Sequence, residues 1–346
     1  MRLILKARLE RILSTAWLQR GWLAWVLWPL SLMYGALVRL RQQGYRLGWF
    51  HSDRLPVPVV VVGNLVAGGA GKTPLVIALV QHLQAQGIAV GVISRGYGRR
   101  STSCVRVLAK MPVADVGDEP ALIHQRTSAP VVVGHPRILA GKMLLTQMPL
   151  TQILVCDDGL QHLALQRDLD IGVFDDRGVG NGFLLPAGPL REAWPRSLDL
   201  LLHTGAHPSF AGLTARRSLG ATAIRADGST VLLAELAHAP FPPLLALAAI
   251  AQPETFFAML REQGVPLADT LSLPDHYDFS SYQRILDKRY SLICTEKDAI
   301  KLWTIRPDAL AVSLVFEPEP AFWAAFDQQI HTLLASYHHV HGHTTS

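Results

Sequence analysis

The chain has 346 residues, of which 49% are hydrophobic and 17% are charged, and its formal net charge is +5. This length is enough for two α/β lobes or for one large domain with an annex. Eight basic residues against the single acid Glu10 give residues 1–46 a charge of +7, which leaves −2 for the remainder. Because the positive charge is confined to one end, we expect no nucleic-acid partner for the body of the protein.

The three cysteines, Cys104, Cys156 and Cys294, are far apart and lack the C-x-x-C spacing of a zinc or redox site. They fit a reducing compartment and the role of small core residues, and they do not form the pattern of a disulfide framework. The sequence shows no internal repeat and no evident obligate protein partner.

The N-terminal segment, residues 1–50, predicts an amphipathic helical anchor at a membrane surface. Residues 21–38 contain no charged side chain, and five of the eight tryptophans lie in the segment beside its basic residues. Indole rings favour the headgroup level of a bilayer, and arginines favour anionic lipid. Flanking arginines and Pro29 disfavour a spanning helix, and the bulky aromatics disfavour a secretory signal. A helix buried against the body is the other alternative.

A glycine-rich turn from Gly63 to Thr73 predicts a phosphate-binding loop. A valine-rich strand over residues 57–62 precedes it, and a helical pattern to about Gln86 follows it. Backbone N–H groups of such a loop surround phosphate oxygens, its lysine reaches the β- and γ-phosphates, and its hydroxyl ligates Mg²⁺. We expect nucleotide binding at Gly68, Gly69, Ala70, Gly71, Lys72 and Thr73, with Lys72 also catalytic and Thr73 also a metal ligand. The strict motif has glycine in place of Val66, and a turn without ligand is the alternative.

Two further loops carry polar residues that suit phosphate or metal chemistry. Arg95 follows an apolar strand over residues 88–94, and the neighbouring glycines allow close approach to phosphate, although an ordinary basic turn is an alternative. Asp118 and Glu119 precede a helical stretch. An acid and a proline in the first turn are typical of a helix start, but these carboxylates are also available as a base and as a metal ligand.

An apolar strand over residues 152–156 ends in Asp157 and Asp158. This is the pattern of a Walker B strand, whose carboxylates hold Mg²⁺ directly or through water. A plain strand-to-turn ending is the alternative. His162, four residues further on, is as suited to a structural role as to a catalytic one. The later segment to Leu190, which contains Asn181, has the composition of an ordered loop rather than a linker.

Beyond residue 205 the pattern changes to that of a smaller α/β lobe, with a hairpin at Asp227-Gly228 and strands over residues 244–250 and 291–295. His276 lies between Asp275 and Asp278, so its imidazole could be oriented by one carboxylate and act on a proton, or it could occupy an exposed turn. We divide the chain into the anchor at 1–50, a P-loop lobe at 51–205, the smaller lobe at 206–336 and a flexible His-rich tail at 337–346. The predicted fold is α/β, a P-loop NTPase-like and mainly parallel sheet with a second lobe.

Seven motifs in order carry a resemblance to a known family. They are G-N-x3-G-G-x-G-K-T-P, S-R-G-Y-G-R, G-D-E-P, D-D-G-x-Q-H, L-L-P-A-G-P-L-R-E, P-D-H-x-x-F and T-E-K-D-A, spread from Gly63 to Ala299. Together with the amphipathic N-terminus, they resemble the tetraacyldisaccharide 4'-kinases, the lipid A 4'-kinases of Gram-negative bacteria. The chain departs from the expected pattern at Ala251-Gln252-Pro253, where a glycine-rich turn would precede the proline.

The resemblance implies ATP-dependent phosphorylation of the 4'-hydroxyl of a tetraacyldisaccharide 1-phosphate, giving lipid IVA, at the cytoplasmic face of the inner membrane. It implies Asp118 as the general base, with His276 as the partner that orients or tunes it. The implied metal ligands are Thr73, Asp157 and Asp158, to which Glu119 is added from its position in the loop. Arg95, Asn181 and Arg191 would line the substrate site. The alternative function is a membrane-associated P-loop ATPase that acts as a nucleotide switch.

The chemistry of such a substrate agrees with the anchor. Each CH₂ group buried in a bilayer contributes about 0.8 kcal/mol, so a tetraacylated lipid does not leave the membrane readily. An enzyme that acts on it therefore has to come to the membrane surface.

Overall fold

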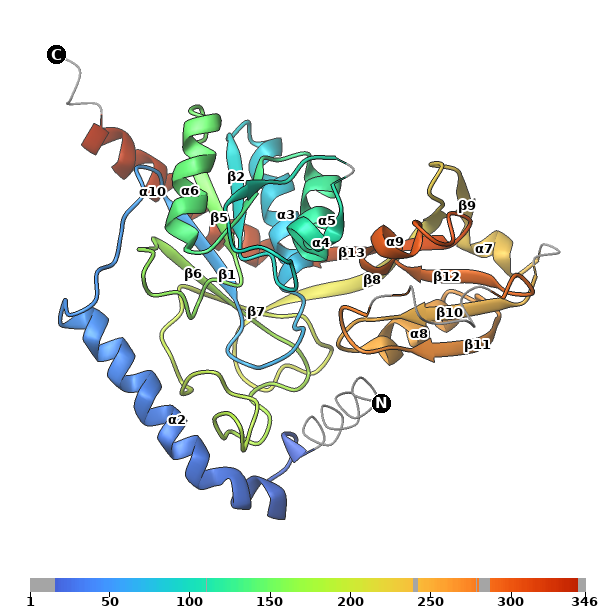
Figure 1. The fold of residues 1–346 in the computed structure, drawn as a ribbon, viewed down its shortest axis with the longest axis horizontal. Helices are drawn as coiled ribbons and strands as arrows, with labels where there is room; N and C mark the ends of the chain where they lie inside the picture. The colour runs from blue at the N-terminus through green and yellow to red at the C-terminus, as the bar shows by residue number, and fades with distance from the viewer. Residues whose placement is uncertain (1–15, 110, 239–241, 278, 280–286, 342–346) are drawn as a thin grey trace.

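The structure is a computed structural model, and it describes residues 16–341 except 110, 239–241, 278 and 280–286. Among the described residues, thirteen strands form one continuous sheet with helices on both faces (Figure 1). The order is β11-β10-β12-β13-β8-β7-β6-β1-β5-β2-β4-β3, with β9 paired to β8. Most neighbouring strands are parallel, as predicted, and the antiparallel pairs are β8 with β13, β3 with β4 and β8 with β9.

The first lobe contains seven strands around β1. Their bounds are β1 Val59–Gly63, β2 Val90–Ser94, β3 Val105–Arg106, β4 Val131–Val133, β5 Ile153–Asp157, β6 Leu169–Phe174 and β7 Leu200–His203. Val60 and Val62 face one buried layer, while Val59 and Val61 face the other. A strand covered on both sides needs apolar side chains at every position, which is why β1 is an unbroken valine run.

Helices cover both faces of this lobe. Their bounds are α3 Lys72–Ala85, α4 Val113–Val116, α5 Asp118–Thr127 and α6 Arg137–Gln147. α3 and α5 pack on the face of Val60, and α6 packs on the face of Val59 through Ile138 and Leu144. The helices that follow β1 and β2 therefore begin at the carboxyl edge of the parallel strands, the edge at which α/β proteins bind ligands.

The described part of the second lobe contains the remaining strands and three short helices. The strands are β8 Leu213–Ile224, β9 Thr230–Leu232, β10 Leu244–Ala248, β11 Leu267–Ser272, β12 Ser291–Thr295 and β13 Leu310–Pro318. The helices are α7 Leu233–Leu236, α8 Pro253–Glu262 and α9 Glu296–Leu302. The predicted hairpin is present as the antiparallel pair of β8 and β9.

The long pair of β8 and β13 joins the two lobes and reverses the strand direction between them (Figure 1). β8 runs parallel to β7, whereas β13 runs antiparallel to β8 from Ala311 opposite Ile224 to Pro318 opposite Ala215. β10, β11 and β12 follow the direction of β13. The carboxyl ends of both sets of strands therefore face each other, and loops from the two lobes meet between them.

The last helix, α10 Pro320–His341, returns to the first lobe. Phe322, Phe326 and Ile330 are fully buried in the same core as Val60 and the apolar side of α3. A segment inside the predicted range 206–336 thus packs on the other lobe, and the division at residue 205 stays a proposal. α10 also continues through the first five residues of the predicted tail, and residues 342–346 lie outside the described residues.

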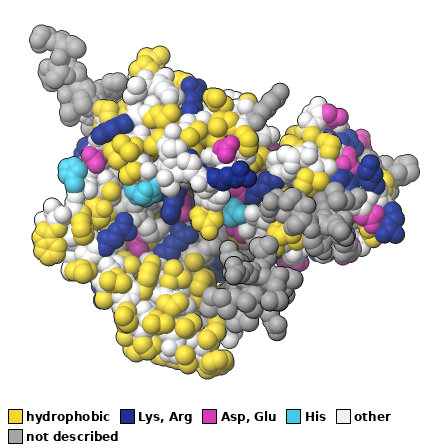
Figure 2. Space-filling view, in the orientation of Figure 1, with side chains coloured by type: hydrophobic (Ala, Val, Ile, Leu, Met, Phe, Trp, Pro, Cys, Tyr) yellow, Lys and Arg dark blue, Asp and Glu magenta, His cyan; other side chains and the backbone are white. Residues whose placement is uncertain are grey.

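The N-terminal helix, α2 Trp22–Arg46, is continuous through Pro29. Its buried residues are the small ones, Ala24, Ser31, Gly35 and Gly44. Large apolar side chains such as Trp22 and Met33 are 78% and 65% exposed, and hydrophobic side chains cover the lower part of the molecule in Figure 2, where Figure 1 places α2. By length and composition this helix could cross a membrane. Because its large apolar side chains are exposed, α2 is not the helix buried against the body that was the alternative to an anchor.

Candidate active site

The glycine-rich turn connects β1 to α3, between the strand and the helix predicted for it. Gly68 and Gly71 have φ angles of +98° and +88°, which residues with a Cβ rarely adopt. Asn64 is fully buried and donates from Nδ2 to the carbonyl of Gly68 at 2.8 Å. Two left-handed glycines and a buried amide therefore fix the turn ahead of the α3 N-terminus, where anions are favoured.

Val66, which replaces the glycine of the strict motif, is a core residue beneath this loop. Its side chain is 2% exposed and packs with Leu65, Phe174 and Leu190. Its backbone also forms a bridge with Leu190. A glycine at this position would leave a gap in the cluster, so packing explains the departure.

Lys72, the first residue of α3, lies between the loop and the end of β5. Its Nζ donates to Asn64 Oδ1 at 3.1 Å and lies 3.5 Å from Asp158 Oδ1. Thr73 follows it in the first turn and is 9% exposed. Both residues therefore lie at the helix start where the P-loop pattern places the lysine and hydroxyl that meet a triphosphate.

Asp157 ends β5 and is 1% exposed. Its Oδ2 accepts a hydrogen bond from Ser94 Oγ at 3.2 Å, while Oδ1 has no hydrogen-bond partner among the described residues. Burial, and then the charges of Glu119 and Asp158, raise the pKa of Asp157 to about 7 against the opposing charges of Lys72 and Arg137. A nearby cation favours the ionised form of a buried carboxylate, so Asp157 is suited to be a metal ligand.

The donor set fits Mg²⁺ bound together with a phosphate ligand. No group of three or more His, Cys, Asp or Glu side chains within the described residues could hold a metal alone. Mg²⁺ at phosphoryl-transfer sites takes one or two carboxylates and completes its shell with phosphate oxygens and water. The unpartnered Oδ1 of Asp157 and the hydroxyl of Thr73 suit that arrangement.

Asp158 follows with a left-handed backbone, at φ 49°. Arg191 Nη1 donates to its Oδ1 at 3.1 Å, and Arg137 Nη2 donates to its carbonyl at 2.5 Å. Burial raises the pKa of Asp158, but the charges of Lys72, Arg191 and Arg137 outweigh it and hold the pKa below its ordinary value. The two adjacent acids therefore differ, since nearby cations prevail at Asp158 and lower its pKa, whereas burial and neighbouring carboxylates prevail at Asp157 and raise its pKa.

Asp118 and His276 come together from opposite lobes. Asp118 begins α5 and is 3% exposed, and its Oδ2 lies 2.7 Å from Nδ1 of His276. An ionised carboxylate only accepts, so Nδ1 carries the proton and donates. His276 has a left-handed backbone, at φ 62°, and its N–H donates to the carbonyl of Ala249 at the end of β10. The strand reversal of the sheet thus places a second-lobe imidazole on a first-lobe carboxylate.

Two lysines of α9 complete this junction. Lys301 Nζ donates to Asp118 Oδ2 at 3.0 Å, and Lys297 Nζ lies 3.3 Å from Glu119 Oε1 and 3.2 Å from Asp275 Oδ1. Burial raises the pKa of Asp118, but the His276 hydrogen bond and the lysine charges outweigh it and hold that pKa well below its usual range. Asp118 is therefore ionised at neutral pH.

The three predicted substrate-binding residues have different environments in the structure. Arg95 is exposed at the end of β2, and Arg191 binds Asp158 at the site. Asn181 is 6% exposed, and its side-chain amide donates to the carbonyl of Ala187 while its oxygen accepts from the N–H of Phe183. These bonds fold the 181–188 loop, so we propose a positioning role for Asn181 in place of direct contact with substrate.

Residues outside the predicted set also take part. Asn64, Arg137, Lys297 and Lys301 all bind predicted site residues. Asn64 and Lys297 lie inside the motifs G-N and T-E-K-D, which could have drawn attention to them, but their partners could not be read from the sequence. Arg137 and Lys301 carry no local signal, because each looks like an ordinary basic residue of a helix.

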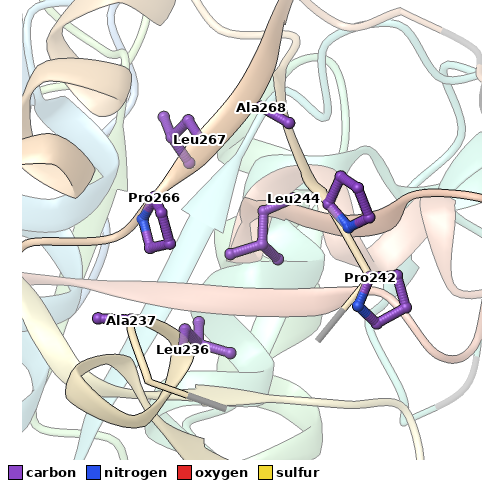
Figure 3. Close-up of a pocket in the computed structure, with 8 residues that line it drawn as sticks. Leu236, Ala237, Pro242, Leu244, Pro266, Leu267 and Ala268 are labelled. Atoms are coloured by element: carbon purple, nitrogen blue, oxygen red, sulfur yellow. The ribbon is translucent and has the colours of Figure 1, made fainter. Parts of the chain in front are cut away.

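A cavity of about 310 Å³ lies elsewhere, in the second lobe (Figure 3). Leucines, alanines and prolines of α7, residues 242–244 and residues 266–268 line it. The described residues that line the cavity include no polar side chain to meet phosphate, so we do not assign nucleotide binding to it.

A glycine-rich loop with its lysine, a buried acid at the end of the neighbouring strand and an ionised aspartate at the lobe junction are together typical of the P-loop phosphotransferases as a class. The model of the family described as Tetraacyldisaccharide-1-P 4'-kinase matches residues 23–335. The chain belongs to this family.

Relatives and a solved structure agree with this assignment. The chain is 54% identical to the tetraacyldisaccharide 4'-kinase of Polaromonas naphthalenivorans (strain CJ2), over 98% of this chain and 100% of the relative. It is 56% identical to the enzyme of that name from Polaromonas sp. (strain JS666), over 95% and 99%. The crystal structure of LpxK from Aquifex aeolicus in complex with ATP superposes with a TM-score of 0.76 at 28% identity, covering 90% of this chain and 99% of that one.

Proposed function

We propose that this protein is an ATP-dependent lipid kinase that phosphorylates the 4'-hydroxyl of a tetraacyldisaccharide 1-phosphate to give lipid IVA. The observation that carries the proposal is the ionised Asp118 of the first lobe, which His276 of the second lobe binds at the junction of the two lobes. A nucleotide switch needs the loop and the Walker B acid, but it does not need a buried base facing an acceptor. Family membership points to the same acceptor.

Phosphoryl transfer in this site requires a small set of roles. The bond between the γ-phosphorus and its bridging oxygen breaks, a bond from the sugar 4'-oxygen forms, and ADP leaves. Asp118 accepts the hydroxyl proton, and His276 keeps its carboxylate oriented. Lys72 stabilises the charge on the phosphates. Mg²⁺ would be held by Asp157, Asp158 and Thr73 with phosphate oxygens, and it supplies charge neutralisation when bound.

Glu119 and Arg95 have more limited support. Glu119 is ion-paired with Lys297, yet its charge acts on Asp157, so it lies close enough to the metal side to assist there. Arg95 is exposed at the carboxyl edge of β2 and is free to meet the phosphate or the sugar of the acceptor. We propose both as auxiliary residues.

We propose that the protein associates with a membrane through α2. Its exposed tryptophans, leucines and Met33 present an apolar surface on the outside of the body, and Arg39, Arg41 and Arg46 lie toward its end. An apolar face flanked by cations suits an anionic lipid surface. Because ATP is cytoplasmic, we propose the inner leaflet of the inner membrane as the location.

The test is transfer of labelled phosphate. Purified full-length protein is incubated with γ-labelled ATP, Mg²⁺ and the lipid disaccharide 1-phosphate in mixed micelles, and the position of the new phosphate is read by mass spectrometry and NMR. Phosphate on the 4'-oxygen is the expected product. ATP hydrolysis without labelled lipid would reject the kinase assignment in favour of the switch.

A further inference from the structure

Arg177, in the loop after β6, binds the outer side of the glycine-rich loop. Its Nη1 donates to the carbonyl of Ala67 at 3.2 Å, and its Nη2 donates to the carbonyl of Gly69 at 3.1 Å. A methyl group on Gly68 would lie 3.0 Å from Nη1, so the guanidinium fits closely against the turn. A carbonyl that accepts from Arg177 cannot at the same time point its negative end at a phosphate.

Asp175 holds the guanidinium in this position. It is 3% exposed and accepts from Arg177 at two places, Nε to Oδ1 at 3.0 Å and Nη2 to Oδ2 at 2.7 Å. Such a bidentate pair fixes the plane of the guanidinium as well as its place. The remaining donors are thereby directed at the loop.

A residue of the second lobe, Gln252, binds Asp175 in turn. Gln252 Nε2 donates to Asp175 Oδ2 at 2.9 Å. Gln252 precedes α8 as its N-cap residue, yet its side chain makes no capping bond. Next to it, Ala251 Cβ would lie 3.0 Å from a methyl group placed on Gly69. These are the residues at which the sequence departs from a glycine-rich turn.

We propose that Gln252, Asp175 and Arg177 form a latch that couples the position of the second lobe to the shape of the nucleotide loop. When the lobes are together, Gln252 fixes Asp175, Asp175 orients Arg177, and Arg177 holds two loop carbonyls away from the phosphate side. The loop N–H groups then stay available to the nucleotide. The inference rests on the proposed function only in taking the nucleotide to be ATP. Gln252, Asp175 and Arg177 are all positioning residues.

The first measurement is the dissociation constant of MgATP, obtained by calorimetry on the full chain without lipid. Gln252→Met keeps the size of the side chain and removes the donor, so affinity should fall about fivefold, the effect of losing one hydrogen bond. Arg177→Ala removes two charge-assisted bonds and should weaken binding about 30-fold. Arg177→Lys keeps the charge but loses the paired donors of the planar guanidinium, so its loss of MgATP affinity should lie between those of the other two variants.

A matched control and a double variant separate the latch from a general loss of structure. Gln263→Met makes the same replacement at an exposed position just beyond α8 and should leave the affinity unchanged. In the Arg177→Ala background, Gln252→Met should add almost nothing, because Gln252 acts only through Asp175 and Arg177. Thermal unfolding of each variant shows whether it is folded. If Arg177→Ala does not fold, Gln252→Met still tests the proposal, because its side chain is only half-buried.

The proposal is overturned if Gln252→Met binds MgATP as tightly as Gln263→Met does. It is equally overturned if the effects of Gln252→Met and Arg177→Ala add in the double variant. It is also overturned if kcat at saturating ATP falls while the dissociation constant does not change, since the residues would then act on a later step. A wild-type chain that binds MgATP but phosphorylates no lipid would refute the proposed function. The MgATP affinities of the variants would still show whether the latch exists.

Discussion

The two lobes contribute to the site in different ways. The first lobe supplies backbone and acids at the ends of its strands, namely the glycine-rich loop after β1 and Asp157-Asp158 after β5. The second lobe supplies single side chains from loops and from α9, among them His276 and Lys301, each of which binds Asp118. The first lobe therefore holds the residues that we propose to meet the nucleotide, whereas the second lobe binds the proposed base, Asp118. Substitutions in the glycine-rich loop and in the Asp118 cluster should consequently affect different kinetic constants.

Lys72→Ala should have the largest effect. Loss of the cation beside the phosphates removes both ground-state binding and transition-state stabilisation, so kcat/KM should fall roughly 10³-fold with KM for ATP raised. Steady-state kinetics with labelled ATP measures it. Lys142→Ala, at an exposed position of α6, is the matched control. Activity near the wild-type level in Lys72→Ala would remove the loop from the chemistry.

Asp118→Asn should come next and should change a different constant. The amide cannot accept the hydroxyl proton, so kcat should fall roughly 10²-fold, while KM for ATP changes little because the hydrogen bonds of the Asp118 side chain go to Glu119, His276 and Lys301, all outside the loop. The same kinetic assay separates the two constants. Wild-type turnover in this variant would show that Asp118 is not the base.

Lys301→Met should shift the pH dependence. The ammonium 3.0 Å from Asp118 helps to keep the pKa of that carboxyl low, so its removal raises the pKa. A base must be deprotonated, and the acidic limb of the kcat profile should therefore move to higher pH, with activity lost first on acidification. Lys301→Arg, which keeps the charge, should restore the wild-type limb. An unshifted limb in Lys301→Met would mean that the ion pair does not tune the base.

Glu296→Gln should have the smallest effect. Glu296 of α9 pairs with Arg126 of α5 at 2.6 Å, so this bridge also joins the lobes, but it does not touch Asp118. We expect stability to fall by no more than about 1 kcal/mol and kcat to change less than about twofold. Chemical denaturation and kinetics test both. A large loss of kcat would show that lobe contact in general, and not the Asp118 cluster, determines turnover.

The sequence was a good guide to the first lobe and a partial one to the second. An acid directly after an apolar strand must lie at the carboxyl edge of a parallel sheet, so Asp157 could be placed before any coordinates were known. His276 could be named as a candidate but not positioned, because its contact with Asp118 depends on the direction change between β8 and β13. Lys301 and Gln252 depend on that reversal too, and neither has a local signature.

The contacts of α2 have a geometric consequence for the substrate. Ser31 Oγ donates to the carbonyl of Leu184 at 2.7 Å, and Tyr34 Oη donates to the carbonyl of Arg191 at 2.9 Å. The helix is thereby fastened to the same loop whose arginine binds Asp158. If α2 rests on a membrane surface, as we propose, these contacts fix the distance of that surface from Asp158. The acceptor hydroxyl would then have to reach that distance above the acyl chains to be phosphorylated.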